Sequence, residues 1–236
     1  MSKKQEIRER RRKQKKQKQL VTIGLIIIGA GLIAAALIYP NTQLNNEFRS
    51  RYMADGNTMG NPDAPVTITE YFDYRCSHCG DFARETEPLI EEAFIETEKV
   101  HFVARSVGDM LGSAPSVLAT EASYCAADQN KYWEMYDLVF ANQGVTITQS
   151  ILEKWAKTAG VEMDAFDECM RSNVYDERIA QDKVDAEAEG ISGTPSFVVS
   201  YVVNGEEVKQ LLPGNYPFDA FEQVIVQAYQ EMGLEY

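Results

Sequence analysis

Apolar residues alternate with polar ones from Val66 to Tyr74, which puts every second side chain on one face of an extended segment. This period of two predicts a strand with one buried face. Glu70 falls on the same face as the apolar residues. Burial would raise the pKa of its carboxyl group, which could then relay protons to Cys79. A solvated glutamate at a strand end is the alternative that this pattern leaves open.

A helix is predicted directly after this strand, over residues 77–96, with a kink at Pro88 because proline removes a backbone donor. A second strand over 100–107 comes next, followed by roughly eighty residues with helical periodicity. Ser150 and Glu153 have the spacing of a capping box at the start of the third helix in that stretch. The predicted helices of the stretch cover residues 114–126, 131–141, 151–159, 163–171 and 175–189.

Strands return near the end of the chain. Residues 196–203 and 206–212 are predicted strands, and Asn204-Gly205 between them is a strong signal for a tight hairpin. A final amphipathic helix is predicted over residues 218–232. Helices therefore alternate with strands, and the last two strands pair as a hairpin, which predicts an α/β fold with a mixed sheet.

The N-terminal region has a different pattern. Residues 1–19 hold ten Lys or Arg and two Glu, and residues 20–39 carry no charge at all. Twenty uncharged residues are long enough, as a helix, to cross the hydrocarbon core of a membrane, so we predict one transmembrane anchor rather than a nucleic-acid-binding tail. The basic flank predicts that the N-terminal residues 1–19 lie in the cytoplasm and residues 41–236 outside. A cleavable signal peptide, with a small-residue site at Ala34–Ala36, is the alternative.

Length, charge and cysteine content indicate how the chain after the anchor is organised. The chain has 236 residues and a net charge of −13, of which the basic tail contributes +8. Residues 40–60 are polar with little periodicity and predict a linker, so that one domain over residues 61–236 remains. Four cysteines, an even number, are expected to form disulfides in an oxidising compartment.

The chemistry is predicted at Cys76-Ser77-His78-Cys79, which opens the first helix. Unpaired N–H groups and the helix dipole favour a thiolate at the first cysteine, and a thiolate is the nucleophile of disulfide exchange. Cys79 lies one turn further along, where it can resolve a mixed disulfide. His78 adds a positive charge or a donor beside Cys76.

Other uses of two cysteines at this spacing fit less well. A zinc ribbon needs a second pair of ligands at close spacing, whereas Cys125 and Cys169 are isolated from each other. A haem attachment motif needs His directly after the second cysteine, where this chain has Gly80. A purely structural disulfide would close a very short loop and restrain little chain.

A second segment of the site is predicted at Gly193-Thr194-Pro195, directly before the third strand. A cis proline at a tight turn would expose the backbone of Thr194 for strand-like pairing with a substrate peptide. An ordinary trans proline at the start of a strand is the alternative.

The chain resembles the DsbA-like thioredoxin-fold thiol-disulfide oxidoreductases, of which some members are membrane-anchored. The residues that carry the resemblance are Glu70, Cys76-Ser77-His78-Cys79, Thr86-Glu87-Pro88, Gly193-Thr194-Pro195 and Asn204-Gly205. It implies a thioredoxin fold with a helical domain inserted at about residues 108–189. It also implies Cys76 as nucleophile, Cys79 as resolving cysteine, His78 as thiolate stabiliser, Glu70 as buried carboxylate and Pro195 as cis.

The resemblance implies a function as well. The protein would oxidise reduced exported proteins, need no cofactor or metal, and be reoxidised by a membrane quinone-linked partner of the DsbB or VKOR type. A structural Cys125–Cys169 disulfide is expected within the inserted helices. Ser77 and Thr194 depart from the best-known DsbA pattern and predict a milder oxidant. The alternatives are a reductase or isomerase of the same fold, or a soft-metal module that uses Cys76, His78 and Cys79.

Overall fold

The computed structural model describes residues 48–108, 110 and 113–236. The predicted basic tail, the predicted anchor over 20–39 and the first part of the predicted linker lie outside these residues. Within the described ranges, no helix has the length and apolar character needed to cross a membrane.

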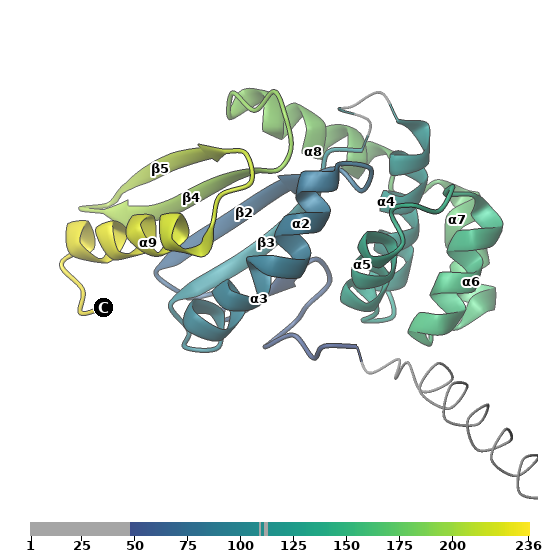
Figure 1. The fold of residues 1–236 in the computed structure, drawn as a ribbon, viewed down its shortest axis with the longest axis horizontal. Coiled ribbons are helices and arrows are strands. Elements are labelled where there is room, and N and C mark those ends of the chain that lie inside the picture. Colours follow the sequence, from purple (N-terminus) through teal and green to yellow (C-terminus); the bar gives the residue numbers. More distant parts are fainter. Residues whose placement is uncertain (1–47, 109, 111–112) are drawn as a thin grey trace, which may run out of the picture. The chain divides into compact units, whose positions relative to one another are not determined.

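Five strands form one mixed sheet (Figure 1). Strands β2 and β3 are parallel, because the chain between them crosses over through helices, and all other neighbours are antiparallel. Asn204 and Gly205 adopt φ values of 55° and 86° in the β4–β5 hairpin, as the predicted tight turn requires. In sheet order, the strands are β1 (Thr58–Met59), β3 (Val100–Ser106), β2 (Val66–Phe72), β4 (Ser196–Val203) and β5 (Glu206–Pro213).

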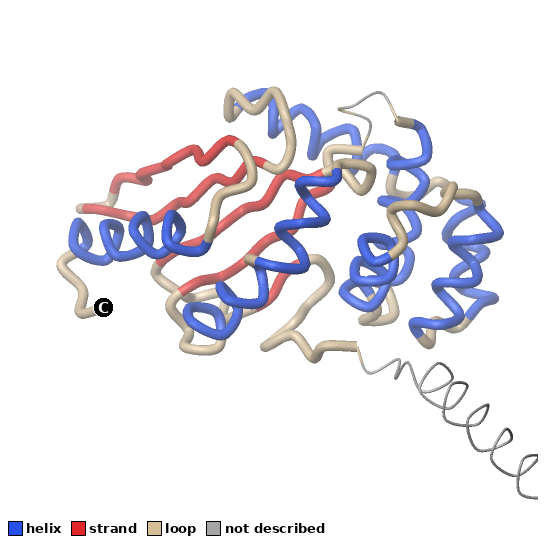
Figure 2. The backbone as a smooth tube through the Cα atoms, in the orientation of Figure 1, coloured by secondary structure: helices blue, strands red, loops and turns tan. Residues whose placement is uncertain are grey.

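Helices α2 (Ser77–Glu85) and α9 (Phe218–Met232) pack on one face of this sheet (Figure 2). The ring of Phe82 in α2 contacts Phe197 of β4 and Phe221 of α9, with centroids 4.4 and 5.7 Å apart. Stacked and tilted aromatic rings at such distances add to the burial of apolar area. This face therefore holds the main core beneath the two-cysteine turn.

The helix predicted over residues 77–96 is divided in the structure. It consists of α2, then α3 (Glu87–Ile90), then a π-helical turn, η1 (Glu91–Ile95). The division falls at Thr86, two residues before Pro88, because proline cannot donate to the preceding turn. The effect of Pro88 was predicted, whereas the π-helical turn was not.

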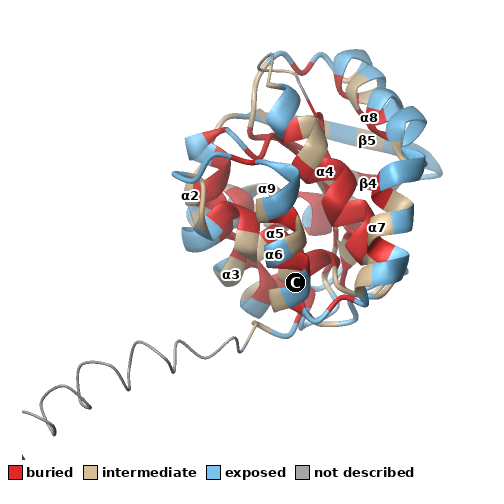
Figure 3. Ribbon diagram, turned by 90° about the vertical axis from the view of Figure 1, so that its right-hand side faces the viewer, coloured by how far each residue is buried: buried red, intermediate tan, exposed pale blue. Residues whose placement is uncertain are grey.

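The helical block comes between β3 and β4 in the sequence. Its central helix α4 is buried on most of its surface (Figure 3). A disulfide joins Cys125 of α4 to Cys169 of α7. One local prediction was wrong, because Thr148 and not Ser150 caps α6: its hydroxyl accepts from the Ile151 N–H. The helices of the block are α4 (Ala114–Ala127), α5 (Tyr132–Ala141), α6 (Gln149–Ala159), α7 (Met163–Ser172) and α8 (Asp176–Ala188).

The predicted linker over residues 40–60 is wrong for its described part. Residues 48–60 pack against the domain, and β1 within them extends the sheet beside β3. The Asn57 amide donates to the Ala104 carbonyl at 2.6 Å, and the Trp133 indole donates to the Thr58 carbonyl at 3.1 Å. A segment of polar residues without periodicity can still be ordered when its polar groups find partners in the fold.

Candidate active site

The two-cysteine turn begins where β2 ends. Cys76 is the N-cap residue of α2, so its sulfur lies beside the unpaired N–H groups of the first helical turn. Asp73 shapes this turn, because its carbonyl accepts from the Cys76 N–H at 3.0 Å and its carboxylate accepts from the Arg75 N–H at 2.7 Å. The hydroxyl of Ser116 in α4 also donates to the Asp73 carboxylate. Strand β2 thus leads through a short turn into helix α2, and the first cysteine is the residue at which the helix begins.

The two sulfurs differ in environment. Cys76 is 8% exposed and Cys79 is fully buried, and neither is in a disulfide. A hydrogen bond from the Cys79 thiol lowers the pKa of Cys76 to about 5, with the backbone N–H groups of Cys79 and His78 adding to the effect and burial opposing it. Burial raises the pKa of Cys79 well above that of a free thiol, and the neighbouring Cys76 and Glu70 charges raise it further. At neutral pH the reduced pair therefore holds one thiolate and one thiol.

Alkylation of Cys76 should consequently show a midpoint near pH 5. The measurement is the rate of iodoacetamide modification against pH, read at Cys76 by mass spectrometry after the pair has been reduced. Unfolded protein in denaturant supplies the reference, where the midpoint should return to about 8.5. A folded midpoint near that reference would show that the turn does not stabilise the thiolate.

The loop before β4 meets the active-site turn. The Thr194–Pro195 peptide bond is cis, and the Cys76 sulfur lies 3.2 Å from the Thr194 carbonyl oxygen. A cleft of about 270 Å³ lies along this loop, lined by Gly190–Ser196 and by Pro213 and Gly214. The structure therefore brings Thr194 and Pro195 next to Cys76, although they are far from it in the sequence.

Ser77 and His78 lie on the solvent side of the turn and are both exposed. The imidazole of His78 is 72% exposed, and its Nδ1 lies 3.9 Å from the Asp81 carboxylate. His78 helps to lower the pKa of Cys76 through its backbone N–H, which bonds to the Cys76 sulfur. A role for the imidazole in stabilising the thiolate therefore stays a prediction.

Glu70 is fully buried in the middle of β2, on the face that its periodicity indicated. The Tyr136 hydroxyl donates to its Oε2 at 3.3 Å. Burial raises the pKa of Glu70 well above its usual value, and the Glu87 charge raises it further. A buried carboxyl group with a raised pKa thus lies on the inner side of the cysteine pair.

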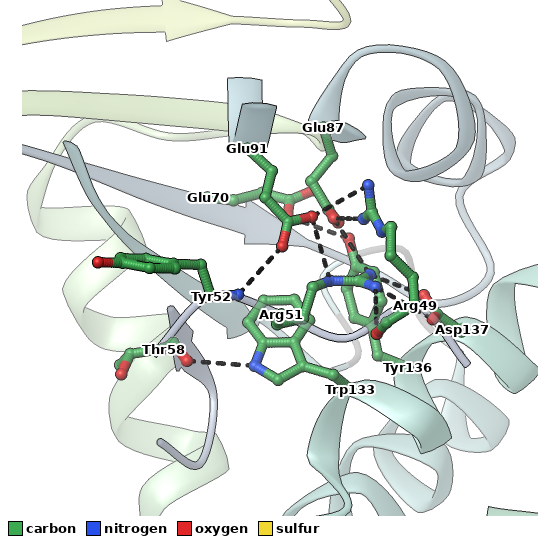
Figure 4. Close-up of polar contacts among 10 residues, drawn as sticks. All are labelled: Arg49, Arg51, Tyr52, Thr58, Glu70, Glu87, Glu91, Trp133, Tyr136 and Asp137. Atoms are coloured by element: carbon green, nitrogen blue, oxygen red, sulfur yellow. Dashed lines mark hydrogen bonds and ion pairs between the residues drawn. The ribbon is translucent and has the colours of Figure 1, made fainter. Parts of the chain in front are cut away.

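A cluster of charged side chains lies next to Glu70, on the side of Glu87 and Glu91 (Figure 4). We call it the buried charge cluster, and it consists of Arg49, Arg51, Glu87, Glu91 and Asp137. The two arginines come from the segment predicted as linker, and the carboxylates come from α3, η1 and α5. Sequence reasoning missed all of these roles. The one available signal was the spacing of Glu87 and Glu91, which puts two carboxylates on the same helical face.

A soft-metal module would need several ligands that point to one place. Among residues 48–108, 110 and 113–236, no three His, Cys, Asp or Glu side chains gather in a way that could hold a metal ion. In particular, the His78 ring points to Asp81 rather than joining the two sulfurs.

Comparisons with known proteins relate the chain to the thioredoxin family. The thioredoxin family model matches residues 53–215. A putative protein-disulfide oxidoreductase of Rickettsia felis is 25% identical over 187 residues, which cover 76% of this chain and 63% of that protein. The Na(+)/H(+) antiporter NhaA 3 of Salinispora tropica is 31% identical over 173 residues, or 73% of this chain but 24% of the antiporter. The chain thus spans about a quarter of such antiporters and less than two thirds of this oxidoreductase.

Two solved structures share the fold. The crystal structure of alpha-DsbA1 from Wolbachia pipientis superposes with a TM-score of 0.66 at 24% identity, covering 79% of this chain and 96% of that one. Oxidised BdbD from Bacillus subtilis superposes with a TM-score of 0.61 at 23% identity, covering 76% and 96%.

Proposed function

This chain belongs to the thioredoxin family, as a DsbA-like member, and we propose that it is an oxidoreductase that donates the Cys76–Cys79 disulfide to exported proteins. The observation that carries the proposal is the contrast between the two sulfurs. One is stabilised as a thiolate at the mouth of the site, and the other is buried as a thiol. A disulfide whose reduced form is stabilised in this way is a good electron acceptor.

The exchange takes place in two steps. A substrate thiolate attacks the Cys76 sulfur, the disulfide bond breaks, and Cys79 leaves with the electron pair and takes up a proton. Glu70 is the proposed donor of that proton, because its carboxyl group is buried, has a pKa well above its usual value, and lies close enough to Cys79 to act on the pKa of that thiol. A second substrate thiolate then attacks the substrate sulfur of the mixed disulfide, and Cys76 leaves as a thiolate.

The electrons and protons balance over the two steps. The substrate loses two electrons and gains a disulfide, while the enzyme ends with the Cys76 thiolate and the Cys79 thiol. Because the pKa of Cys76 is low, it is the better leaving group, which directs the second step toward release of oxidised substrate. The backbone of Thr194 lies beside the sulfur, and it is the proposed docking site at which the substrate chain pairs in an extended conformation.

The enzyme must be reoxidised after each cycle. We propose that a membrane quinone-linked oxidase of the DsbB or VKOR type does this, outside the cytoplasm, with the chain anchored through residues 20–39. The Cys125–Cys169 disulfide supports that location, since such bonds persist in oxidising compartments.

The reduction potential tests the direction of the reaction. Equilibration with glutathione buffers, read by trapping and mass spectrometry of the Cys76–Cys79 pair, should give a potential less negative than about −200 mV. A Cys79→Ala variant is the control for signal from the Cys125–Cys169 disulfide. A potential near the −270 mV typical of thioredoxin would instead favour a reductase.

A further inference from the structure

Gln143 holds the active-site turn from the outside. It lies in the loop that follows α5, and its Nε2 donates to two carbonyl oxygens, that of Tyr74 at 2.9 Å and that of Cys76 at 2.8 Å. A primary amide nitrogen has two hydrogens, so both donors are used on the same turn. The two acceptors lie on either side of Arg75: Tyr74 is two residues before the nucleophile, and Cys76 is the nucleophile itself. One side chain of the helical block thus joins two backbone carbonyl groups of the active-site turn.

Gly80 leaves the space that this bridge occupies. A Cβ atom at position 80 would lie 2.1 Å from the Gln143 Oε1 and 2.8 Å from the Arg84 Nη1. Gly80 itself donates its N–H to the Cys76 carbonyl at 3.2 Å, so the same oxygen accepts from Gly80 and from Gln143. Glycine is poorly suited to the interior of a helix, yet it stands in the first turn of α2. The close approach of the Gln143 amide accounts for it.

We propose that Gln143 is a positioning residue for Cys76, which aligns the turn so that the helix N–H groups face the sulfur; the inference rests on the function proposed above. The amide fixes the Cys76 carbonyl and thereby the peptide plane that follows it. The N–H groups of His78 and Cys79 in that turn act on the sulfur. The amide hydrogens also offset the partial negative charge of two carbonyl oxygens close to the thiolate. Both effects favour the anion.

Loss of the amide should therefore raise the Cys76 midpoint and make the protein a weaker oxidant. Gln143→Met keeps the length of the side chain and removes both donors. We expect its midpoint to rise by ~0.5 to 1 pH unit, which lowers the alkylation rate below the midpoint by about threefold to tenfold. The glutathione equilibrium should shift toward the disulfide by a similar factor.

Gly80→Ala tests the same idea without changing Gln143. The added methyl group must displace the amide, and since the displaced atoms end a flexible side chain, the backbone can stay in place. Alanine also favours the helix, so the melting temperature should not fall. The Cys76 midpoint should nevertheless rise as in Gln143→Met, a combination that a merely structural role would not give. In the double variant the two midpoint shifts should not add.

The control is Gly144→Ala, one residue from Gln143, where an added Cβ meets nothing within 4 Å. Its midpoint should equal that of the unmodified chain. Unchanged midpoints in Gln143→Met and Gly80→Ala would overturn the positioning role. So would a further shift when Gly80→Ala is added to Gln143→Met, because the methyl group would then act through Arg84. If the unmodified chain itself titrates near 8.5, the proposed function fails and this inference with it.

Discussion

Replacement of Arg51 by methionine is expected to lower the free energy of unfolding by ~3 to 5 kcal/mol, the usual cost of removing one partner from a buried ion pair. The Arg51 side chain is 1% exposed. Its Nη2 and Nη1 contact the two Asp137 oxygens at 2.8 and 3.2 Å, and Nη2 lies 3.1 Å from Glu87. Its guanidinium also lies over the Trp133 ring, 5.1 Å from the centroid.

The cost arises at Glu87 more than at Arg51. Glu87 is fully buried, and burial raises its pKa against the pull of Arg51 and Arg49, which lower it. Without Arg51 the carboxylate must either stay charged with less compensation or take up a proton. Methionine fills the volume but offers no charge, so the penalty remains.

Thermal unfolding measures the effect. At ~2 to 4 °C per kcal/mol, the melting temperature of Arg51→Met should fall by at least ~6 °C. Arg49→Met is the matched control, because its side chain is 33% exposed and its loss should cost less. Adding Glu87→Gln to Arg51→Met should recover part of the stability, since it removes the uncompensated charge. Equal losses from the two arginines, or no recovery in the double variant, would contradict a buried charge cluster held by Arg51.

The parts of this fold that sequence reasoning predicted depend on local patterns. The alternation over β2 placed Glu70 on the buried face, Asn204-Gly205 marked the hairpin, and α9 begins and ends at Phe218 and Met232 as predicted. The two-cysteine turn was readable for the same reason, since its chemistry depends on a helix start within four residues. In each case the determining interactions lie within a few residues of each other.

The parts that were missed depend on contacts between distant residues. Arg51 reaches Asp137 across 86 positions, and Gln143 reaches Cys76 across 67. A buried arginine in a polar segment has the same sequence signature as a solvated one, so residues 48–60 looked like a linker. Thr148 was missed as a cap for a smaller reason, because Ser150 and Glu153 offered an equally good pattern two residues later.

Reduction of the Cys76–Cys79 disulfide should raise the melting temperature of the domain, and raise it more at higher pH. The folded pKa of Cys76, about 5, is lower than the ~8.5 of an unfolded thiol. Between these values the folded reduced protein binds fewer protons than the unfolded one, so its stability increases with pH. Cys79 stays a thiol over this window and contributes nothing to the slope.

The advantage of the reduced form should therefore grow by up to ~1.4 kcal/mol per pH unit from pH 5 to about 8.5, or ~3 to 6 °C per unit, and be lost as pH falls to 5. The short loop that the disulfide closes gives the oxidised form a contribution that does not depend on pH. Melting curves of both redox forms should be compared at several pH values in a Cys125→Ala/Cys169→Ala variant, because reduction of that second disulfide would lower stability and hide the effect. Cys76→Ser, added to this variant, can form neither the thiolate nor the active-site disulfide, so its stability should follow that of the oxidised form with pH and lack the gain seen in the reduced form. If the oxidised form melts higher throughout, and the difference stays constant with pH, the pair is a reductant and the thiolate at Cys76 is not what drives the exchange.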